Sequence, residues 1–215
     1  MVQVLKPAVR ARIQDAALRC FATDGYPGTS MAAVAAAAHT ASANVYRYYA
    51  SKQELFNAVV PQDLADRHDK LLDTRVAALT QEAANAQAAA AELLAFWLGH
   101  RLAMVVLLDR AEGTHFAHYP AAFVQRLVGH AEQALNGRPS PAQYEILQLV
   151  FDNTRRAIAR ILATGTDREE TAALITAFWS YQLPGLNGLT AFINSGLRSG
   201  SSGSGAGLVD VGEGN

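Results

Sequence analysis

Cysteine is almost missing from this sequence, and its scarcity excludes two kinds of chemistry. Cys20 is the one cysteine among 215 residues. A single thiol cannot close a disulfide within the chain, and it cannot build a thiolate metal site from one chain. Because Cys20 falls on an apolar helical stripe, we expect a small buried hydrophobic residue there and not a redox sensor.

Long apolar runs are missing as well. No run reaches the roughly 18 residues that a membrane-spanning helix needs, and the opening residues MVQVLKPAVR hold no apolar stretch of signal-peptide length. Half of the residues are hydrophobic and 17% are charged, so the chain can still bury a sizeable core. We therefore expect a soluble, cytoplasmic protein with no membrane partner.

Sequence signatures of catalysis are absent. The chain has no nucleophile elbow, no glycine-rich phosphate loop and no H-E-x-x-H zinc signature. His115 and His118 can share one helical face, but zinc normally needs more ligands. His100, Asp109 and Glu112 could contribute, although nothing in the sequence shows that they converge. We expect no enzyme activity, no catalytic residues, no cofactor and no metal site.

The chain has no large excess of either charge, since its net charge is −1. The distribution is uneven. Residues 1–60 hold six basic and three acidic residues, whereas the rest of the chain holds twelve basic and sixteen acidic ones. A basic start on an acidic remainder is the modest electrostatic pattern of a protein that binds phosphates at one end.

Strand alternation is also absent, and apolar residues recur with helical spacing along the chain. Three capping boxes, at 51–54, 140–143 and 166–169, predict helices that start near residues 52, 141 and 167. Pro7 suits the first turn of the first helix, which Gly25 ends. Further helices are expected at about 52–78, 82–109 and 120–136, with a short helical turn at 114–118.

Proline and glycine predict three interruptions. Pro61 removes a backbone hydrogen bond inside the helix at 52–78, which predicts a kink and a hinge at about 57–61. Pro184 and Gly185 predict a bend in the last helix, at 167–194. From Gly196 the chain is rich in glycine and serine, so we expect a flexible tail that cannot bury enough apolar surface to order itself.

Two short helical segments lie between Thr29 and Leu55. Thr29 and Ser30 can cap the first, whose N-terminus is also suited to a phosphate. The second, Ser42 to Tyr48, is too short to persist alone in water, so the rest of the domain must hold it. Two short helices joined by a tight turn form a helix-turn-helix, and the second helix of that motif enters the major groove of DNA.

Exposed positions on the second helix are predicted to face DNA. Asn44 can pair with adenine through two hydrogen bonds, and Arg47 can pair so with guanine. Tyr48 and Lys52 are better placed for phosphates, which position a protein without reading sequence. The predicted DNA-binding set is Thr29, Ser30, Ser42, Ala43, Asn44, Tyr46, Arg47, Tyr48 and Lys52.

The pairs Gly25-Tyr26, Ser51-Lys52 and Leu55-Phe56, with Thr29 and the run 45–49, form a pattern that resembles the N-terminal domain of tetracycline-repressor-like (TetR/AcrR) regulators. The resemblance covers about residues 9–57. It implies an all-α fold of about nine helices, with a three-helix DNA-binding domain at 1–56 and a helical ligand-binding and dimerisation domain at 57–195. The tail expected from the composition then occupies residues 196–215. The resemblance also implies a homodimer through the helices at about 141–163 and 167–194.

Two positions depart from the family pattern. His39 stands in the turn where the family usually has glycine, so a left-handed backbone there would carry some strain. Thr40-Ala41 and Ala43 stand where the family often has a Val-Ser pair and a glycine. The usual serine cap of the second helix is therefore missing, and we expect Thr40 or Ser42 to replace it.

Aromatic and polar residues on inward stripes of the remaining helices predict a ligand pocket, with ordinary core packing as the alternative for each. A buried Arg101 or Arg155 needs a partner. Asp109, Glu112 and Asp152 are candidates, and an anionic or hydrogen-bonding effector is another. The predicted pocket residues are Trp97, Arg101, Met104, Leu108, His115, Phe116, Phe123, Phe151, Arg155, Phe178 and Trp179.

The last two long helices are apolar on more than one face, which favours pairing with a second copy. Gly185 and Gly188 would permit a close approach there. One predicted dimer stripe is Leu147, Phe151, Ile158, Ile161 and Leu162, and the other is Leu174, Phe178, Tyr181, Leu186, Leu189 and Phe192.

The sequence therefore predicts a ligand-responsive regulator, most often a repressor, that binds a palindromic operator in double-stranded DNA as a homodimer. An unidentified small molecule would enter the body and spread the two DNA-reading domains. The alternative is an architectural or division-control protein that binds DNA without an effector. Only a pocket, or its absence, separates these two hypotheses.

Overall fold

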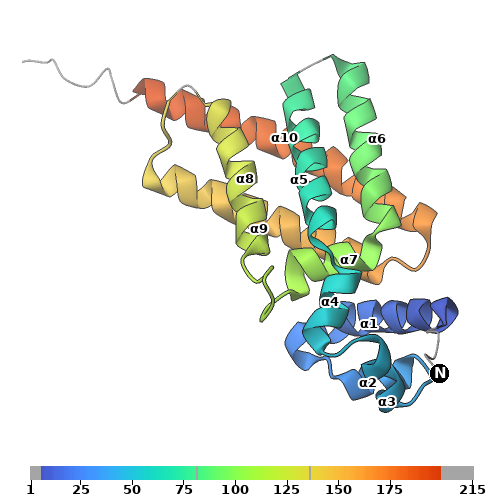
Figure 1. Ribbon diagram of the computed structural model, residues 1–215. Helices are drawn as coiled ribbons and strands as arrows, with labels where there is room; N and C mark the ends of the chain where they lie inside the picture. The colour runs from blue at the N-terminus through green and yellow to red at the C-terminus, as the bar shows by residue number, and fades with distance from the viewer. Residues whose placement is uncertain (1–5, 81, 136, 200–215) are drawn as a thin grey trace, which may run out of the picture.

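A computed structural model describes residues 6–80, 82–135 and 137–199, and every regular element within those ranges is helical. This confirms the expected all-α class. A small head, residues 6–60, lies at one end of the molecule, and a larger body, residues 61–199, extends away from it (Figure 1).

The head consists of α1 (Pro7–Gly28), α2 (Met31–Ala37), α3 (Ser42–Tyr48) and α4 (Lys52–Val59). Their apolar faces meet in a fully buried core that includes Ile13, Val34 and Val45. Gly25 interrupts α1 with φ 71° and ψ 170°, a backbone shape that glycine adopts readily, and one more helical turn follows it. The predicted helix end at Gly25 is therefore a break inside α1.

The chain between head and body differs from its prediction. The expected bent helix at 52–78 is two helices, because α4 ends at Val59 and α5 (Gln62–Ala77) begins after Pro61, its N-cap residue. Val60 between them has φ −129° and ψ 74°. A proline disfavours helical geometry in the residue before it, which accounts for a full break in place of a kink.

The next expected helix, at 82–109, is also broken. After the short 3₁₀ turn η1 (Ala78–Thr80), α6 (Ala83–Gly99) ends at glycine, and α7 (Arg101–Val105) continues into a π-helical turn, η2 (Val106–Arg110). The two directions differ by 96°. Within the described ranges no single helix has the length and hydropathy to cross a membrane; this bent pair satisfies that test only when its two halves are joined.

Residues 111–118 form a turn, so the short helix expected at 114–118 is absent. The Ala117 amide donates to the Thr114 carbonyl over 3.1 Å, and the Tyr119 amide donates to Phe116 over 2.9 Å. The chain then enters α8 (Tyr119–Gln133). These turn bonds do not repeat, so no helix propagates.

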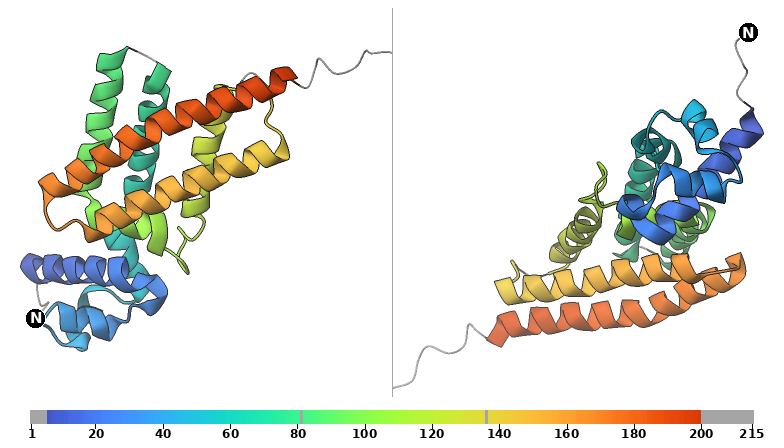
Figure 2. Two further views of the ribbon diagram at one scale, coloured as in Figure 1. Left: turned by 180° about the vertical axis from the view of Figure 1, so that it is seen from behind. Right: turned by 90° about the horizontal axis from the view of Figure 1, so that it is seen from below.

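The two last helices, α9 (Pro141–Thr164) and α10 (Arg168–Ser199), run side by side along one face, with α10 outermost (Figure 2). Ser140 and Gln143 form the predicted capping box of α9. At α10 the cap is Asp167 and not Thr166, because the Asp167 carboxylate accepts from the amides of Glu169 and Glu170.

The backbone of α10 passes through Pro184 without a break and continues to Ser199. It therefore extends four residues into the segment that was expected to be a tail. The remainder of that predicted tail, residues 200–215, lies outside the described residues.

A buried histidine connects α5 to α8. The His68 Nδ1 lies 2.8 Å from the Tyr119 hydroxyl, which donates to the Asp69 carboxylate over 2.5 Å. Since that hydroxyl proton is committed to Asp69, His68 is assigned as the neutral tautomer with its proton on Nδ1. Burial, followed by the charge of Arg126, lowers the pKa of His68 to about 3.

A second polar group joins the same two helices nearer the surface. The Arg126 guanidinium donates to Asp69 and to Asp73, each over 2.7 Å, and His130 Nε2 lies 3.0 Å from Asp73. Burial opposes charge on Asp73, but the hydrogen bonds from His130 and Arg126 outweigh it and lower the pKa of Asp73. These ion pairs connect α8 to α5 at the surface of the body.

Aromatic rings join the head to the body. The ring of Phe56 on α4 lies 5.2 Å from that of Tyr26, 6.5 Å from Phe116 and 6.1 Å from His115. Phe116 and His115 belong to the turn before α8. The head is thus packed sideways against this turn as well as being connected through the chain at Pro61.

Candidate nucleic-acid interface and ligand cavity

The start of α2 is formed by two hydroxyl residues with different partners. Ser30 is the N-cap, and its hydroxyl accepts from the Ala33 amide over 3.0 Å, as predicted for one of this pair. Thr29 is 2% exposed, and its hydroxyl donates to the Gly25 carbonyl over 2.8 Å. Of these two residues, only Ser30 has an exposed side chain.

The turn between α2 and α3 has the left-handed residue that was expected. His39 has φ 50°, and within the described ranges no other residue except glycine has positive φ. The Arg12 side chain supports the turn from α1, because its Nε donates to the Ala38 carbonyl over 2.9 Å. The turn lacks glycine, but this hydrogen bond from α1 stabilises it.

The start of α3 differs from the prediction. Its N-cap is Ala41, and no side chain caps it, so neither Thr40 nor Ser42 replaces the missing serine. The Thr40 hydroxyl instead accepts from the Asn44 side-chain amide over 2.8 Å. That bond orients Asn44 across the first turn of the helix, which explains how a short uncapped helix keeps its geometry.

α3 has one buried face and one face that points away from the head. Val45 is fully buried and Tyr48 is 9% exposed, whereas Tyr46 is 53% exposed. Arg47 and Ala43 are also exposed, and Ser42 and Asn44 are half-buried. Five of the predicted DNA-binding residues are thus gathered along one short helix at the outer end of the molecule (Figure 1).

Tyr48 and Lys52 have partners inside the chain. The Tyr48 hydroxyl accepts from the Lys6 amide over 3.1 Å. The Lys52 ammonium donates to the carbonyls of Tyr26 and Thr29, over 2.7 Å and 2.9 Å, and lies 4.2 Å above the Tyr26 ring. These carbonyls account for a cation at the start of α4 without a phosphate.

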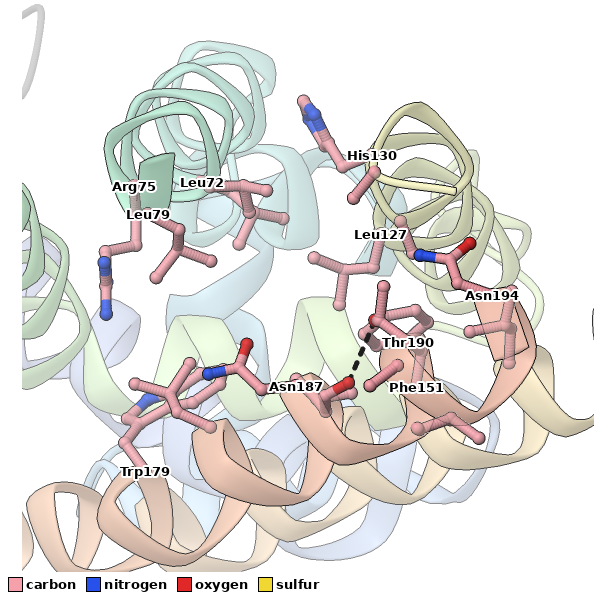
Figure 3. Close-up of a pocket in the computed structure, with 18 of the residues that line it drawn as sticks. Leu72, Arg75, Leu79, Leu127, His130, Phe151, Trp179, Asn187, Thr190 and Asn194 are labelled. Carbon is pink, nitrogen blue, oxygen red and sulfur yellow. Dashed lines mark hydrogen bonds between the residues drawn. The ribbon is translucent and has the colours of Figure 1, made fainter. Parts of the chain in front are cut away.

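The body contains a cavity of about 460 Å³ between α5, α6, α8, α9 and α10 (Figure 3). Phe151 and Trp179, both predicted as ligand contacts, line it. A neighbouring cavity of about 280 Å³ shares Arg75, Leu93 and Trp179 with the first and adds Trp97, another predicted contact. Three of the predicted pocket residues are therefore brought together around joined space.

The other predicted pocket residues lie elsewhere. Met104 and Leu108 are fully buried in the core, with Phe116 and Phe123 also buried and Phe178 half-buried against it. His115 packs on Phe56 at the junction with the head. None of these residues lines either of the two cavities.

The two arginines singled out from the sequence are paired within the chain. Arg155, 5% exposed, donates to the Leu108 carbonyl and forms ion pairs with Asp109 and Asp152, two of its predicted partners. Arg101 donates to the Leu162 carbonyl over 2.6 Å. Both side chains connect α9 to the bent segment at 101–110.

Sequence reasoning missed most of the cavity wall. One available signal was polar spacing on α10, where Asn187, Thr190 and Asn194 recur every three or four residues in an apolar helix. Arg75 was also missed. Its Nη1 atom is buried without a hydrogen-bond partner, and burial lowers the pKa of this guanidinium. Over the described ranges, no group of three or more potential ligands is placed to hold a metal.

Comparison with known proteins supports the head most directly. Residues 13–59 match the family described as bacterial regulatory proteins, tetR family. No curated protein matches the chain. The crystal structure of a TetR family transcriptional regulator from Chloroflexus aurantiacus J-10-fl is 15% identical with a TM-score of 0.54, over 89% of this chain and 94% of that one. This likeness shows the fold.

Two crystal structures of NalD, the secondary repressor of the MexAB-OprM multidrug efflux pump in Pseudomonas aeruginosa, are also similar in sequence. One is 21% identical, with a TM-score of 0.34, over 80% of this chain and 95% of that chain. The other is 20% identical, with a TM-score of 0.35, over 81% and 97%.

Proposed function

We propose that this chain is a TetR-like helix-turn-helix repressor that binds a palindromic operator as a homodimer and is released by a small molecule. The proposal is supported by the match of residues 13–59 to the tetR family of bacterial regulatory proteins and by the fold. The observation that carries the proposal is the exposed outer face of α3. The opposite face of this helix is buried and packs against the rest of the head. The predicted domain at residues 1–56 would read DNA, and residues 57–195 would bind the ligand and the second copy.

The predicted DNA contacts divide into two groups under this proposal. Asn44, Tyr46 and Arg47, with Ser42 and Ala43 beside them, would face base edges in the major groove. Ser30 would contact a phosphate at the start of α2. Thr29, Tyr48 and Lys52 would act mainly by holding the head together, because their polar atoms bind backbone atoms of the head.

The outer face of α10 supports a homodimer. Of seven large hydrophobic side chains that are exposed in the described residues, five lie on α9 and α10, which concentrates apolar surface on one face. Leu174, Tyr181 and Phe192 share a stripe of α10 with Gly185 and Gly188, where an added Cβ would meet nothing within 4 Å. A second copy could approach closely at these glycines.

The α9 part of the predicted dimer stripe is wrong for a physical reason. Leu147, Phe151, Ile158 and Leu162 are buried in the chain's own core, at 6% exposure or less. The exposed apolar residues of α9 are Ile146 and Leu149, on the neighbouring face. Sequence periodicity located an apolar stripe on α9 but could not show that the body itself covers it.

Of the two hypotheses, the cavity favours a regulator that is controlled by a ligand, and not a DNA-binding protein that has no effector. The cavity wall includes Leu72, Arg75 and Val76 of α5, which follows α4 across the break at Pro61, and Leu79 of η1. A ligand that binds one position of α5 better than another would shift the population of head positions by that difference in affinity. The cavity falls within the usual size range of small-molecule sites.

The test is selection of double-stranded DNA from a random pool by the full chain, followed by binding measured as fluorescence anisotropy. We expect an inverted repeat, and affinity that falls steeply with salt as counterions are released. Arg47→Ala should weaken the selected site roughly 5- to 150-fold, the range for one base-reading pair. Arg138→Ala, in the loop before α9, is the matched control and should leave affinity unchanged.

Recovery of no preferred sequence would contradict the proposal. The dimer is tested separately by sedimentation of a Tyr181→Glu, Phe192→Glu variant, which should be monomeric where the native chain is dimeric. Tyr46→Glu changes an exposed ring on the head and should leave the dimer intact. A monomeric native chain at the concentrations used for DNA binding would exclude the homodimer.

A further inference from the structure

The cavity wall has an uneven distribution of charge. The larger cavity is lined mostly by leucine, alanine and aromatic side chains, with Asn187, Thr190, Asn194 and His130 as neutral polar groups or weak bases. Arg75 lines both cavities, and no aspartate or glutamate lines either within the part of the chain that the structure describes. The lining of this space is therefore mostly apolar, with one fixed positive charge.

Arg75 differs from three other arginines of the body. Arg155, Arg126 and Arg101 each donate to carboxylates or carbonyls of the chain. Arg75 forms no ion pair with any described residue, and its Nη1 atom is buried without a partner. A buried N–H donor on a charged group costs free energy when it is left unpaired. The described chain supplies no acceptor for this donor, so a bound molecule could supply one.

A second donor lies beside the same space. The indole Nε1 of Trp97, which lines the smaller cavity, is also buried without a partner. In Figure 3 the Arg75 side chain extends from α5 past Leu79 toward Trp179 of α10, at the region where the two cavities meet. Guanidinium and indole groups can only donate, so both require an acceptor.

We propose that the effector is a lipophilic anion, a carboxylate with a hydrocarbon body, whose carboxylate pairs with Arg75 while its apolar part fills the larger cavity. The anion site is argued from the cavity alone. Only the description of the bound molecule as an effector rests on the proposed function. A guanidinium pairs with a carboxylate through parallel hydrogen bonds, which favours this head group over an alcohol or an amine. Each buried methylene of the tail adds affinity.

The test uses the chain's own fluorescence. The sequence has two tryptophans, Trp97 and Trp179, and both line the cavities, so a bound molecule changes their emission. Decanoate, decanol and decylammonium are titrated into the full chain, each below its micelle-forming concentration and without DNA. We expect decanoate to bind at least about 10-fold more tightly than decanol, the effect of a charge-assisted hydrogen bond, with decylammonium weakest.

Arg75→Gln should weaken decanoate roughly 10- to 100-fold, because it removes the charge, and should leave decanol unchanged. Unchanged decanol binding and an unchanged circular dichroism spectrum show that the variant is folded. Arg160→Gln is the matched control, since Arg160 is an exposed arginine of α9 that lines neither cavity. It should bind decanoate like the native chain.

Two failures are distinguishable. Equal binding of all three probes, or decanoate binding that is insensitive to Arg75→Gln, overturns the lipophilic-anion inference and leaves DNA binding and ligand control untouched. Decanoate that binds through Arg75 but does not release operator DNA supports the anion site and contradicts its role as effector. Release measured by anisotropy on the same samples separates these outcomes.

Discussion

The head and the body treat their polar groups differently. In the head, Thr29, Tyr48 and Lys52 all bind backbone atoms, so the helix-turn-helix is held by bonds between neighbouring elements. In the body, Arg75 and Trp97 each keep a buried N–H donor without a partner, and both side chains line internal cavities. The Tyr49 hydroxyl of the head is also buried without a partner, but Tyr49 lines neither cavity. The difference is therefore that the body places unpaired donors beside space that a ligand could occupy.

The largest expected effect concerns the place where the two regions meet. Phe56→Ala removes a fully buried ring that contacts Tyr26 in the head and Phe116 in the body. It should destabilise the chain by about 3–5 kcal/mol, as loss of a buried phenylalanine does. Urea unfolding, followed by circular dichroism, measures the loss.

Tyr46→Ala is the control for that change, because Tyr46 is an aromatic residue of the same head with a 53% exposed side chain. Its effect on stability should stay within about 0.5 kcal/mol. If the two variants were equally stable, the head would not depend on its contact with the body.

The next effect should come from the body alone and depend on pH. The pKa of His68 is lowered to about 3 from 6.5, so below pH 6.5 the unfolded chain takes up a proton that the folded chain excludes. The contribution of His68 to the free energy of unfolding is fully present above pH 6.5. Below that pH the free energy of unfolding should fall by up to about 1.4 kcal/mol for each pH unit. His68→Asn removes this contribution, so its stability should change less between about pH 6.5 and 4.5.

The comparison is made by urea unfolding of both proteins at matched pH values. Aspartates such as Asp73, whose lowered pKa also reduces stability in acid, are common to both proteins and cancel in the difference. Parallel curves for the native chain and the variant would show that His68 is not held neutral by its burial.

A smaller effect tests strain in the head. His39 has φ 50°, a conformation that costs a residue other than glycine about 1 kcal/mol. His39→Gly should therefore raise the melting temperature. Ala36→Gly, three residues earlier on an exposed position inside α2, should lower stability by about 1 kcal/mol. Shifts of the same sign for both glycines would show that the turn is unstrained.

The smallest effect is expected from the surface ion pairs of the body. Asp73 is 42% exposed and Arg126 is 35% exposed, so water screens their attraction. Asp73→Asn should cost less than about 1 kcal/mol, and the cost should shrink in high salt. Thermal unfolding at low and high salt checks this. A large loss that salt does not alter would place the pair among the essential contacts between α5 and α8.

The parts of the fold that were predictable depend on local signals. Ser51, Ser140 and Ser30 begin their helices as expected, because a cap uses atoms only a few residues away. The left-handed turn at His39 was predictable from the resemblance, because the similar family usually has glycine at that position. The chain break at Val60 and the bend after Gly99 were not, since a proline or a glycine marks a weak point without giving its angle.

The cavity was less predictable because it depends on which polar groups find partners. Arg101, Arg155 and Arg75 are three arginines on helical stripes, and the sequence alone does not distinguish them. In the folded chain the first two meet carbonyls or carboxylates, while Arg75 Nη1 meets none. That difference arises from contacts across the fold, 46 residues apart in the case of Arg155 and Asp109.

The break between α4 and α5 has a mechanical consequence. A continuous helix behaves as a stiff rod and carries twist along its axis, but the backbone of Val60, with φ −129° and ψ 74°, interrupts the hydrogen-bond ladder between α4 and α5. Twist of α5 therefore has no continuous helix through which to reach α4. The lateral contact of Phe56 with Phe116 is a second connection between the head and the body, independent of this joint.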